Sequence, residues 1–230
     1  MLNLVFDYDG TLHNSIEIYA PAFRLAYKEL VEKGFVEPRD YSDKEISYWL
    51  GFSAAEMWHT FMPTLEASQK QNASMRIGKE MIGLIKEGKA KLYPHALEIL
   101  EQLKIKGYNL IFLSNCKRAY MEAHIEAFQL EQYFTGFYCS EDYGFIPKYE
   151  IFNVIKTRYT GDFIIIGDRF QDMEIAQKYQ LESIGCLYGF GDENELEMAT
   201  YKIHSLDEIE QTICLLEYPI RDHTSVFIKE

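Results

Sequence analysis

Basic residues are scarce in this chain. Its 230 residues include 23 lysines and arginines against 36 aspartates and glutamates, which gives a formal net charge of −13. A negative excess of this size disfavours binding to nucleic acid or to an anionic membrane surface. It does not exclude a small anionic substrate, provided that the site itself is positive or holds a metal ion. We therefore expect no nucleic-acid partner.

Long apolar runs and closely spaced cysteines are also absent. No apolar stretch reaches the roughly 18 residues of a membrane span, and no basic region followed by an apolar segment marks a signal peptide. Four cysteines lie far apart, which disfavours a disulfide framework or a zinc site. We therefore expect a cytoplasmic protein with reduced thiols and no membrane partner.

Apolar segments of strand length alternate with helical patterns along most of the chain. They lie at 2–6, 109–113, 136–139, 162–166 and 183–187. This alternation predicts an α/β fold with a doubly wound parallel sheet, that is, a Rossmann-like core. Only helical patterns occur from about residue 14 to residue 90. We therefore expect a small helical cap domain at 14–90, inserted into a core formed by 1–13 and 91–230.

Two acidic residues directly follow the first predicted strand. Asp7 and Asp9 stand on alternate positions before Gly10, and in an open α/β sheet ligands bind just outside the carboxyl ends of the strands. Close carboxylates repel each other unless a cation or a proton separates them. The pair therefore suits a hard divalent metal, or an ionised nucleophile beside a protonated acid, and one enzyme can use both. An ordinary turn after a strand is the alternative interpretation.

Polar residues follow later strands or begin helices. Ser114 and Asn115 come after the 109–113 strand, where they predict either a phosphate cradle or a helix cap. Lys148 begins a predicted helix, where its ammonium can neutralise a phosphate or the charge between carboxylates, although most lysines are simply solvated.

A second acidic pair follows the 162–166 strand. Asp168 and Asp172, together with Asp7, offer oxygen ligands of the kind that Mg²⁺ prefers. Helix capping by the two aspartates is the alternative. It explains each acid singly, but not their coincidence with the acids after the first strand.

Four segments together resemble the four motifs of the haloacid dehalogenase-like hydrolase superfamily. They are Asp7-Tyr8-Asp9-Gly10-Thr11-Leu12, Ser114-Asn115, Lys148 and Gly167-Asp168-Arg169-Phe170-Gln171-Asp172. The helical insertion after the first motif is similar to the small cap of the branch that contains phosphoglycolate phosphatase and β-phosphoglucomutase. The resemblance covers roughly residues 1 to 215, and its first and fourth motifs are specific when they occur together.

This resemblance implies a Mg²⁺-dependent phosphatase that hydrolyses a small phosphorylated metabolite through an aspartyl-phosphate. Asp7 would be the nucleophile and Asp9 the acid and base. The residues that it assigns to the substrate are Thr11, Ser114, Asn115 and Lys148. Those that it assigns to Mg²⁺ are Asp7, Asp9 through its carbonyl, Asp168 and Asp172. The presence of the second acid, Asp9, disfavours dehalogenation.

The resemblance leaves the substrate open. In phosphoglycolate phosphatases the cap loop that reads the substrate carboxylate resembles an Arg-x-Gly pattern. This chain has Trp49-Leu50-Gly51 there, without the arginine, so phosphoglycolate is not favoured. The residues placed where this branch contacts its substrates are Trp49, Gly51, Phe52, Ser53 and Trp58. For the two tryptophans, a place in the cap core is the favoured interpretation.

Two other functions remain as alternatives. A sugar phosphomutase of the same branch would share every core residue and differ in its cap. A non-catalytic binding or regulatory protein could also use this scaffold, although retention of all four acids of the first and fourth motifs disfavours it. The sequence is compatible with a monomer or a homodimer.

Overall fold

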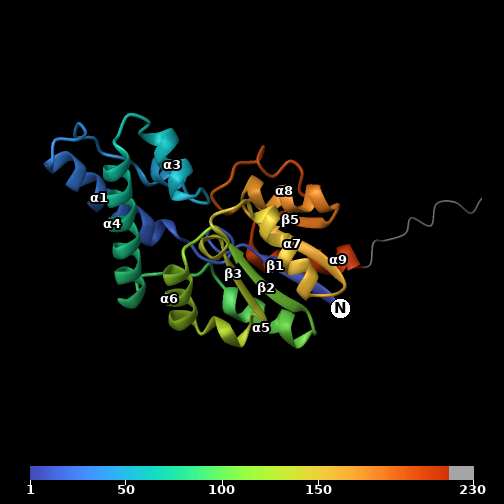
Figure 1. The fold of residues 1–230 in the computed structure, drawn as a ribbon. Helices are drawn as coiled ribbons and strands as arrows, with labels where there is room; N and C mark the ends of the chain where they lie inside the picture. The colour runs from blue at the N-terminus through green and yellow to red at the C-terminus, as the bar shows by residue number, and fades with distance from the viewer. Residues whose placement is uncertain (218–230) are drawn as a thin grey trace, which may run out of the picture.

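The computed structural model describes residues 1–217, and within them six strands form one parallel sheet (Figure 1). The strands are β1 (Leu2–Phe6), β2 (Asn109–Ser114), β3 (Gly136–Cys139), β4 (Asp162–Gly167), β5 (Glu182–Cys186) and β6 (Tyr201–Ile203). Their order is β3-β2-β1-β4-β5-β6, the order of a doubly wound nucleotide-binding fold. The predicted Rossmann-like core is confirmed; its predicted portion from residue 218 onward lies outside the described residues.

Strand β1 lies at the centre of the sheet, which determines where the site forms. Phe6 is in register with Phe112 of β2 on one side and with Ile166 of β4 on the other. The strand order reverses between β1 and β4, and ligands bind at such a switch point. Asp7 and Asp168 directly follow these two strands, so both stand at this position.

Helices cover both faces of the sheet. Side chains alternate along each strand, so Leu4 and Phe6 pack into one apolar layer while Val5 packs into the other. The first layer contains residues of α5 (Ala96–Ile105), α6 (Arg118–Phe128) and α9 (Ile209–Glu217). The second contains residues of α7 (Lys148–Arg158) and α8 (Phe170–Tyr179).

The segment between β1 and α5 is helical, as its pattern predicts. It forms α1 (Ile16–Glu32), α2 (Asp43–Ser47), α3 (Ala54–Phe61) and α4 (Ala67–Lys86), and α1, α3 and α4 lie to one side of the sheet in Figure 1. These helices have an aromatic centre of their own, in which the Phe61 ring lies 5.5 Å from Phe23 and 5.4 Å from Tyr41. We call residues 14–90 the cap.

The cap joins the core through two neighbouring backbone segments. The N–H of Asn14 donates to the Lys91 carbonyl at 2.9 Å, and the N–H of Tyr93 donates to the Leu12 carbonyl at 2.8 Å. His13 and Leu92 form an antiparallel bridge between them. The predicted domain boundaries, at 13/14 and 90/91, fall at these two paired segments and remain a prediction.

The short elements differ from the sequence-based expectation. The pattern did not predict β6, because it has three residues and only Ile203 among them is buried. The sequence also did not predict the 3₁₀ turns at Leu130–Gln132, Ser140–Tyr143 and Leu206–Glu208. Among the described helices, none combines the length and apolar character needed to cross a membrane.

Candidate active site

The turn after β1 brings the first motif against the fourth. The N–H of Asp7 donates to the Ile166 carbonyl at 2.8 Å, which continues the β1–β4 pairing past the strand end. Gly10 then has a φ of +87°, and a Cβ there would lie 2.1 Å from Oδ2 of Asp168. Glycine is therefore required at position 10, both for the backbone conformation and for the space that the carboxylate occupies.

Three aspartates converge at the switch point. Among residues 1–217, Asp7, Asp168 and Asp172 form a group whose carboxylate oxygens lie within 4.8 Å of one another, and all three are buried. The Lys148 ammonium lies 2.7 Å from Oδ1 of Asp7 and 2.7 Å from Oδ1 of Asp172. When all four groups are ionised, three negative charges face one positive charge, and two negative charges remain uncompensated.

This uncompensated charge disfavours ionisation of the carboxyls. Burial raises the pKa of Asp7 well above its usual value, and the Asp172 carboxylate raises it further against the opposing effect of Lys148. Burial and Asp172 likewise raise the pKa of Asp168 to about 7. Burial lowers the pKa of Lys148, but the two carboxylates outweigh it and raise that pKa, so the lysine stays charged.

The donor set fits a divalent cation such as Mg²⁺. Hard cations of this kind bind carboxylate oxygens, and Mg²⁺ uses few of them because it retains several waters. Its two positive charges match the two negative charges that Lys148 leaves uncompensated. The Asp168 carboxylate is already oriented, because it accepts the Phe190 N–H at 2.7 Å and the Thr11 hydroxyl at 3.4 Å.

Mg²⁺ should stabilise this protein more strongly as the pH rises. Between about pH 4 and pH 7 the folded metal-free chain retains the Asp168 proton that the unfolded chain releases, so its stability falls over this range. Mg²⁺ must displace that proton. At about 100 times its Kd the ion adds about 2.7 kcal/mol, or roughly 5 to 10 °C in melting temperature. We expect this thermal shift at about pH 8 and a smaller one at about pH 5.

The control for this thermal shift compares aspartates at the two ends of β4. Asp168→Asn should remove most of the Mg²⁺-dependent shift, whereas Asp162→Asn, at the exposed opposite end of β4, should retain it. An equal shift in Asp168→Asn and wild-type protein would contradict the proposed metal site.

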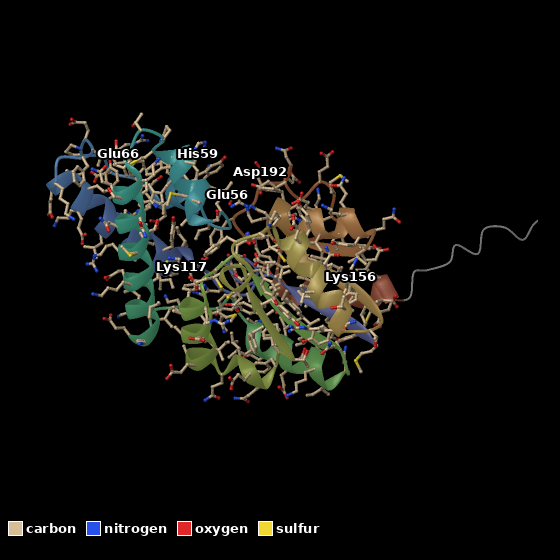
Figure 2. The ribbon with its side chains drawn as sticks, in the orientation of Figure 1. Glu56, His59, Glu66, Lys117, Lys156 and Asp192 are labelled. Atoms are coloured by element: carbon tan, nitrogen blue, oxygen red, sulfur yellow. The ribbon has the colours of Figure 1, made fainter. Side chains whose placement is uncertain are left out.

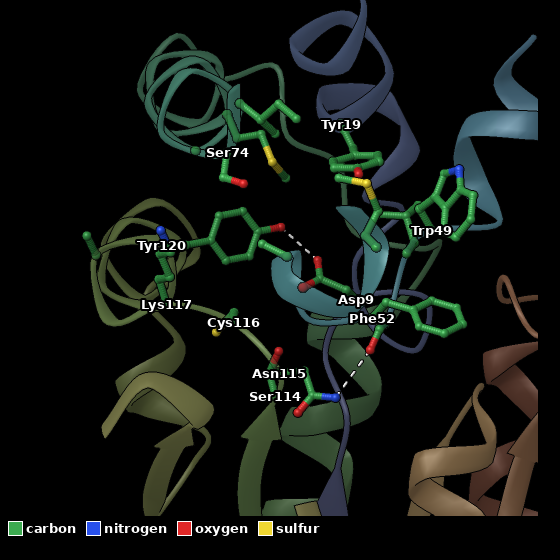
Figure 3. Close-up of a pocket in the computed structure, with 18 of the residues that line it drawn as sticks. Asp9, Tyr19, Trp49, Phe52, Ser74, Ser114, Asn115, Cys116, Lys117 and Tyr120 are labelled. Carbon is green, nitrogen blue, oxygen red and sulfur yellow. Dashed lines mark hydrogen bonds between the residues drawn. The ribbon is translucent and has the colours of Figure 1, made fainter. Parts of the chain in front are cut away.

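Asp9 lies apart from the three buried aspartates and faces the cavity (Figure 3). Its Oδ1 accepts the Tyr120 hydroxyl at 2.7 Å and lies 3.0 Å from Nδ1 of His13. Burial raises the pKa of Asp9, but the hydrogen bonds and the charge of His13 outweigh it and lower that pKa. The two side chains thus hold Asp9 in its ionised, proton-accepting form.

The partners of Asp9 belong to a buried polar and aromatic group. Behind His13, the His124 ring lies 4.4 Å away, and Nδ1 of His124 is 2.8 Å from the Tyr8 hydroxyl. Burial lowers the pKa of His124 to about 3, so this ring is neutral near pH 7. The packed rings fix the orientation of His13 and, through it, of Asp9.

The residues at the end of β2 also line the cavity. Ser114 lines it, and Asn115 holds the cap by donating from Nδ2 to the Gly51 carbonyl at 3.2 Å. The amide of Arg118, at the start of α6, is not free for a phosphate because it donates to Oε2 of Glu141 at 2.9 Å. A phosphate cradle at this position stays a prediction, and the Arg118 N–H would not be one of its donors.

Arg169 of the fourth motif connects the core to the cap. Its guanidinium makes two bonds to Glu195, of 2.8 and 3.1 Å, and it also donates to the Leu50 carbonyl. Gly51 has a φ of +90°, and a Cβ there would lie 2.8 Å from Cγ of Arg169. The arginine thus fixes the cap loop over the site, and each of its three guanidinium nitrogens donates to a protein acceptor.

One cavity of about 350 Å³ connects most of the predicted site residues. Its lining includes Asp7, Asp9, Ser114, Asn115 and Lys148 from the core, and Trp49, Gly51, Phe52 and Trp58 from the cap. Asp168 and Asp172 lie behind it, against Asp7. Thr11 is fully buried against Asp168 and does not line the cavity, and Ser53 caps α3 by accepting the Glu56 N–H. Their predicted roles at the substrate remain predictions.

Sequence reasoning gave no role to three residues that shape this site. They are His13, Tyr120 and Arg169. Tyr120 was detectable in principle, because the first turn of a helix that follows a strand faces the carboxyl edge of the sheet. The position of His13, four residues after Asp9, carries no such signal, because its contact depends on the tight turn at Gly10.

The chain belongs to the haloacid dehalogenase-like hydrolase family, whose sequence model matches residues 4–186. This confirms the predicted superfamily and the prediction of a hydrolase. A phosphoglycolate phosphatase from Synechococcus elongatus is 23% identical over 209 residues, which cover 86% of this chain and 90% of that protein.

Solved structures share the fold. A protein described as a predicted phosphatase from Clostridium acetobutylicum superimposes with a TM-score of 0.78 at 22% identity, over 92% of this chain and 97% of that one. A Thermotoga maritima protein assigned as a β-phosphoglucomutase superimposes with a TM-score of 0.69 at 20% identity, over 93% and 99% of the two chains. At these identities the likeness establishes the architecture.

Proposed function

We propose that this protein is a Mg²⁺-dependent phosphatase that hydrolyses a small phosphorylated metabolite through an aspartyl-phosphate. The observation that carries the proposal is the position of Asp7. It follows the central strand, touches Lys148 at 2.7 Å, belongs to a group of three buried carboxylates, and also lines the cavity. A carboxylate that only capped a turn would not need a lysine, two further carboxylates and a cavity around it at once.

In the first step an Asp7 oxygen attacks phosphorus, and the bond from phosphorus to the substrate alcohol breaks. Asp9, which faces the same cavity, delivers a proton to the departing oxygen. A phosphate dianion beside Asp9 opposes the effect of His13 and raises the carboxyl pKa again. Substrate binding therefore favours the protonated form of Asp9, which is the form that the first step needs.

In the second step Asp9 accepts a proton from a water molecule that attacks the phosphorus of the aspartyl-phosphate. Inorganic phosphate leaves and the Asp7 carboxylate is restored, so the cycle consumes one water and no other reactant. Tyr120 and His13 support this step, because their hydrogen bonds favour the ionised, basic form of Asp9.

Lys148 and the metal would neutralise charge around the transferred group. Asp7, Asp168 and Asp172 would hold Mg²⁺, and when bound it supplies positive charge for the phosphoryl oxygens. The lysine, buried and held between Asp7 and Asp172, supplies a further positive charge at the cavity floor. Phosphoryl transfer depends mainly on such positioning and charge stabilisation.

The cap would exclude bulk water and contact the part of the substrate beyond the phosphate. For phosphoglycolate, that part is a carboxylate and needs a cationic partner. Arg169 reaches the loop where such a partner would act, but each of its three guanidinium nitrogens already donates to Glu195 or to a backbone carbonyl. Phosphoglycolate is therefore a poor fit, despite the relative of that name.

The experiment that tests the proposal is an assay of a panel of phosphorylated compounds with Mg²⁺ and with excess chelator. We expect release of inorganic phosphate from at least one member with Mg²⁺, and a loss of activity of about 10³-fold or more in chelator, because metal charge stabilisation supplies several kcal/mol. Unchanged activity in chelator would contradict the metal dependence, and no hydrolysis of any member would contradict the phosphatase.

The same assay separates the alternatives. A phosphomutase would transfer phosphate between positions of one sugar and would require glucose 1,6-bisphosphate. A regulatory protein on this scaffold would bind phosphorylated ligands without releasing phosphate.

A further inference from the structure

The cavity above Asp7 and Asp9 has a polar floor and apolar walls. The floor comes from the core and the walls come from the cap and from α6 (Figure 3). The apolar side chains among the wall residues include Trp49, Phe52, Met57, Met75, Met81 and Ile82. Tyr120 and Tyr19 also line the space, and their rings lie on different sides of it (Figure 3).

Two hydroxyls of the walls, those of Ser74 and Tyr120, already make hydrogen bonds within the protein. The Ser74 hydroxyl accepts from Nε1 of Trp58 at 2.7 Å and donates to the Lys70 carbonyl at 2.9 Å. The Tyr120 hydroxyl donates to Asp9. These hydrogen atoms are therefore already used within the protein.

Apart from Lys148 at the floor, the cationic groups of the cavity lie at its rim. Lys79 and Lys117 are the lysines of the wall, and both are exposed, so water screens their charge. Figure 2 shows Lys117 at the start of α6, on the surface between the cap and the core. No arginine lines the cavity within residues 1–217.

We propose that the natural substrates are phosphate monoesters of apolar alcohols, whose hydrocarbon or aromatic part fills the cap side of the cavity. This inference rests on the proposed phosphatase activity and adds the class of leaving group. Apolar surface gains free energy on leaving water for such walls. Most hydroxyls of a sugar would lose their water partners there, because the walls are mainly apolar and offer few polar groups to replace them.

The test compares two substrates that differ in polarity and little else. Cyclohexylmethyl phosphate and glucose 6-phosphate are both esters of a primary alcohol that carries a six-membered ring, so their leaving groups have similar reactivity. We expect kcat/KM to be at least about 100-fold higher for cyclohexylmethyl phosphate, because one misplaced hydroxyl already costs about that factor in an apolar site. Phosphoglycolate, tested in parallel, should also be a poor substrate.

Two variants on one helix locate the effect in the cavity. Ile82→Asn places an amide in the wall and should lower the preference for cyclohexylmethyl phosphate about tenfold or more, mainly through KM. Leu84→Asn makes a comparable change two residues along α4, at a half-buried side chain outside the cavity lining, and should leave the preference intact.

The outcomes distinguish this inference from the function on which it rests. Equal or better turnover of glucose 6-phosphate or phosphoglycolate would overturn the apolar specificity and leave the phosphatase intact. Hydrolysis of p-nitrophenyl phosphate without any hydrolysis of cyclohexylmethyl phosphate would overturn it as well. If the protein hydrolyses none of these compounds, the proposed phosphatase activity itself is overturned. The substrate comparison uses wild-type protein, so it stands even where a variant does not fold.

Discussion

Replacing Asp7 by asparagine should abolish turnover while leaving the fold intact. An amide oxygen does not form the acyl phosphate, and loss of a covalent nucleophile in other enzymes costs on the order of 10⁴- to 10⁶-fold in kcat. The fold should tolerate the change, because Asp7 is one of three crowded carboxylates and burial already raises its pKa. Lys148 retains its 2.7 Å contact with Asp172. Phosphate release and thermal unfolding, measured on the same preparation, check both expectations.

The matched control for Asp7→Asn is Asp162→Asn. Asp162 is exposed at the opposite end of β4, so this control makes the same chemical change far from the cavity. We expect it to keep wild-type kcat and melting temperature. Wild-type activity in Asp7→Asn would contradict the nucleophile assignment, and inactivity caused by unfolding would appear in the melting curve.

Replacing Asp9 by asparagine should produce a loss that depends on the leaving group. With an alkyl phosphate, whose alcohol needs a proton to depart, we expect kcat to fall about 10²- to 10⁴-fold, as is typical when a general acid is removed. With an activated aryl phosphate the first step needs less help, so the rate of phosphoryl transfer to Asp7 should fall less than with the alkyl phosphate. Measuring single-turnover rates with both kinds of substrate separates the two steps.

The control for Asp9→Asn is the variant Tyr120→Phe. It keeps the Asp9 carboxylate and removes only the hydroxyl that donates to it at 2.7 Å. We expect Tyr120→Phe to retain activity and to move the Asp9-dependent limb of the kcat/KM profile to higher pH, because a donor to the ionised form lowers the pKa. Equal losses with alkyl and aryl substrates in the single-turnover rate of the first step of Asp9→Asn would contradict the acid role.

The sheet and the position of the site were predictable because their signals are local. A buried parallel strand is a largely apolar segment, and five of the six described strands coincide with a segment of this kind in the sequence. Parallel strands bring their carboxyl ends to one edge, so Asp7, Asp168 and Ser114 could be placed near each other without coordinates. Strand β6 carried no such signal, because two of its three residues are not buried.

The surroundings of the site depend on contacts that span the whole chain. The bonds of Arg169 to Glu195 and to the loop at Leu50 join segments whose spacing in the sequence is arbitrary. The same holds for Tyr120 and Asp9, which are 111 positions apart. The apolar walls of the cavity also look like ordinary cap core in the sequence. Trp58 serves both purposes, since it is buried and also lines the cavity.

The most direct test of the mechanism is to trap the phosphoryl group on the protein. Asp9→Asn, mixed with an activated aryl phosphate and Mg²⁺ and quenched in acid, should retain the nucleophile and lack the base that activates water. Mass spectrometry should then find one added phosphoryl group on the peptide that contains Asp7, and none in the double variant with Asp7→Asn. A phosphoryl group on Ser114 instead, or one that persists in the double variant, would contradict the aspartyl-phosphate mechanism.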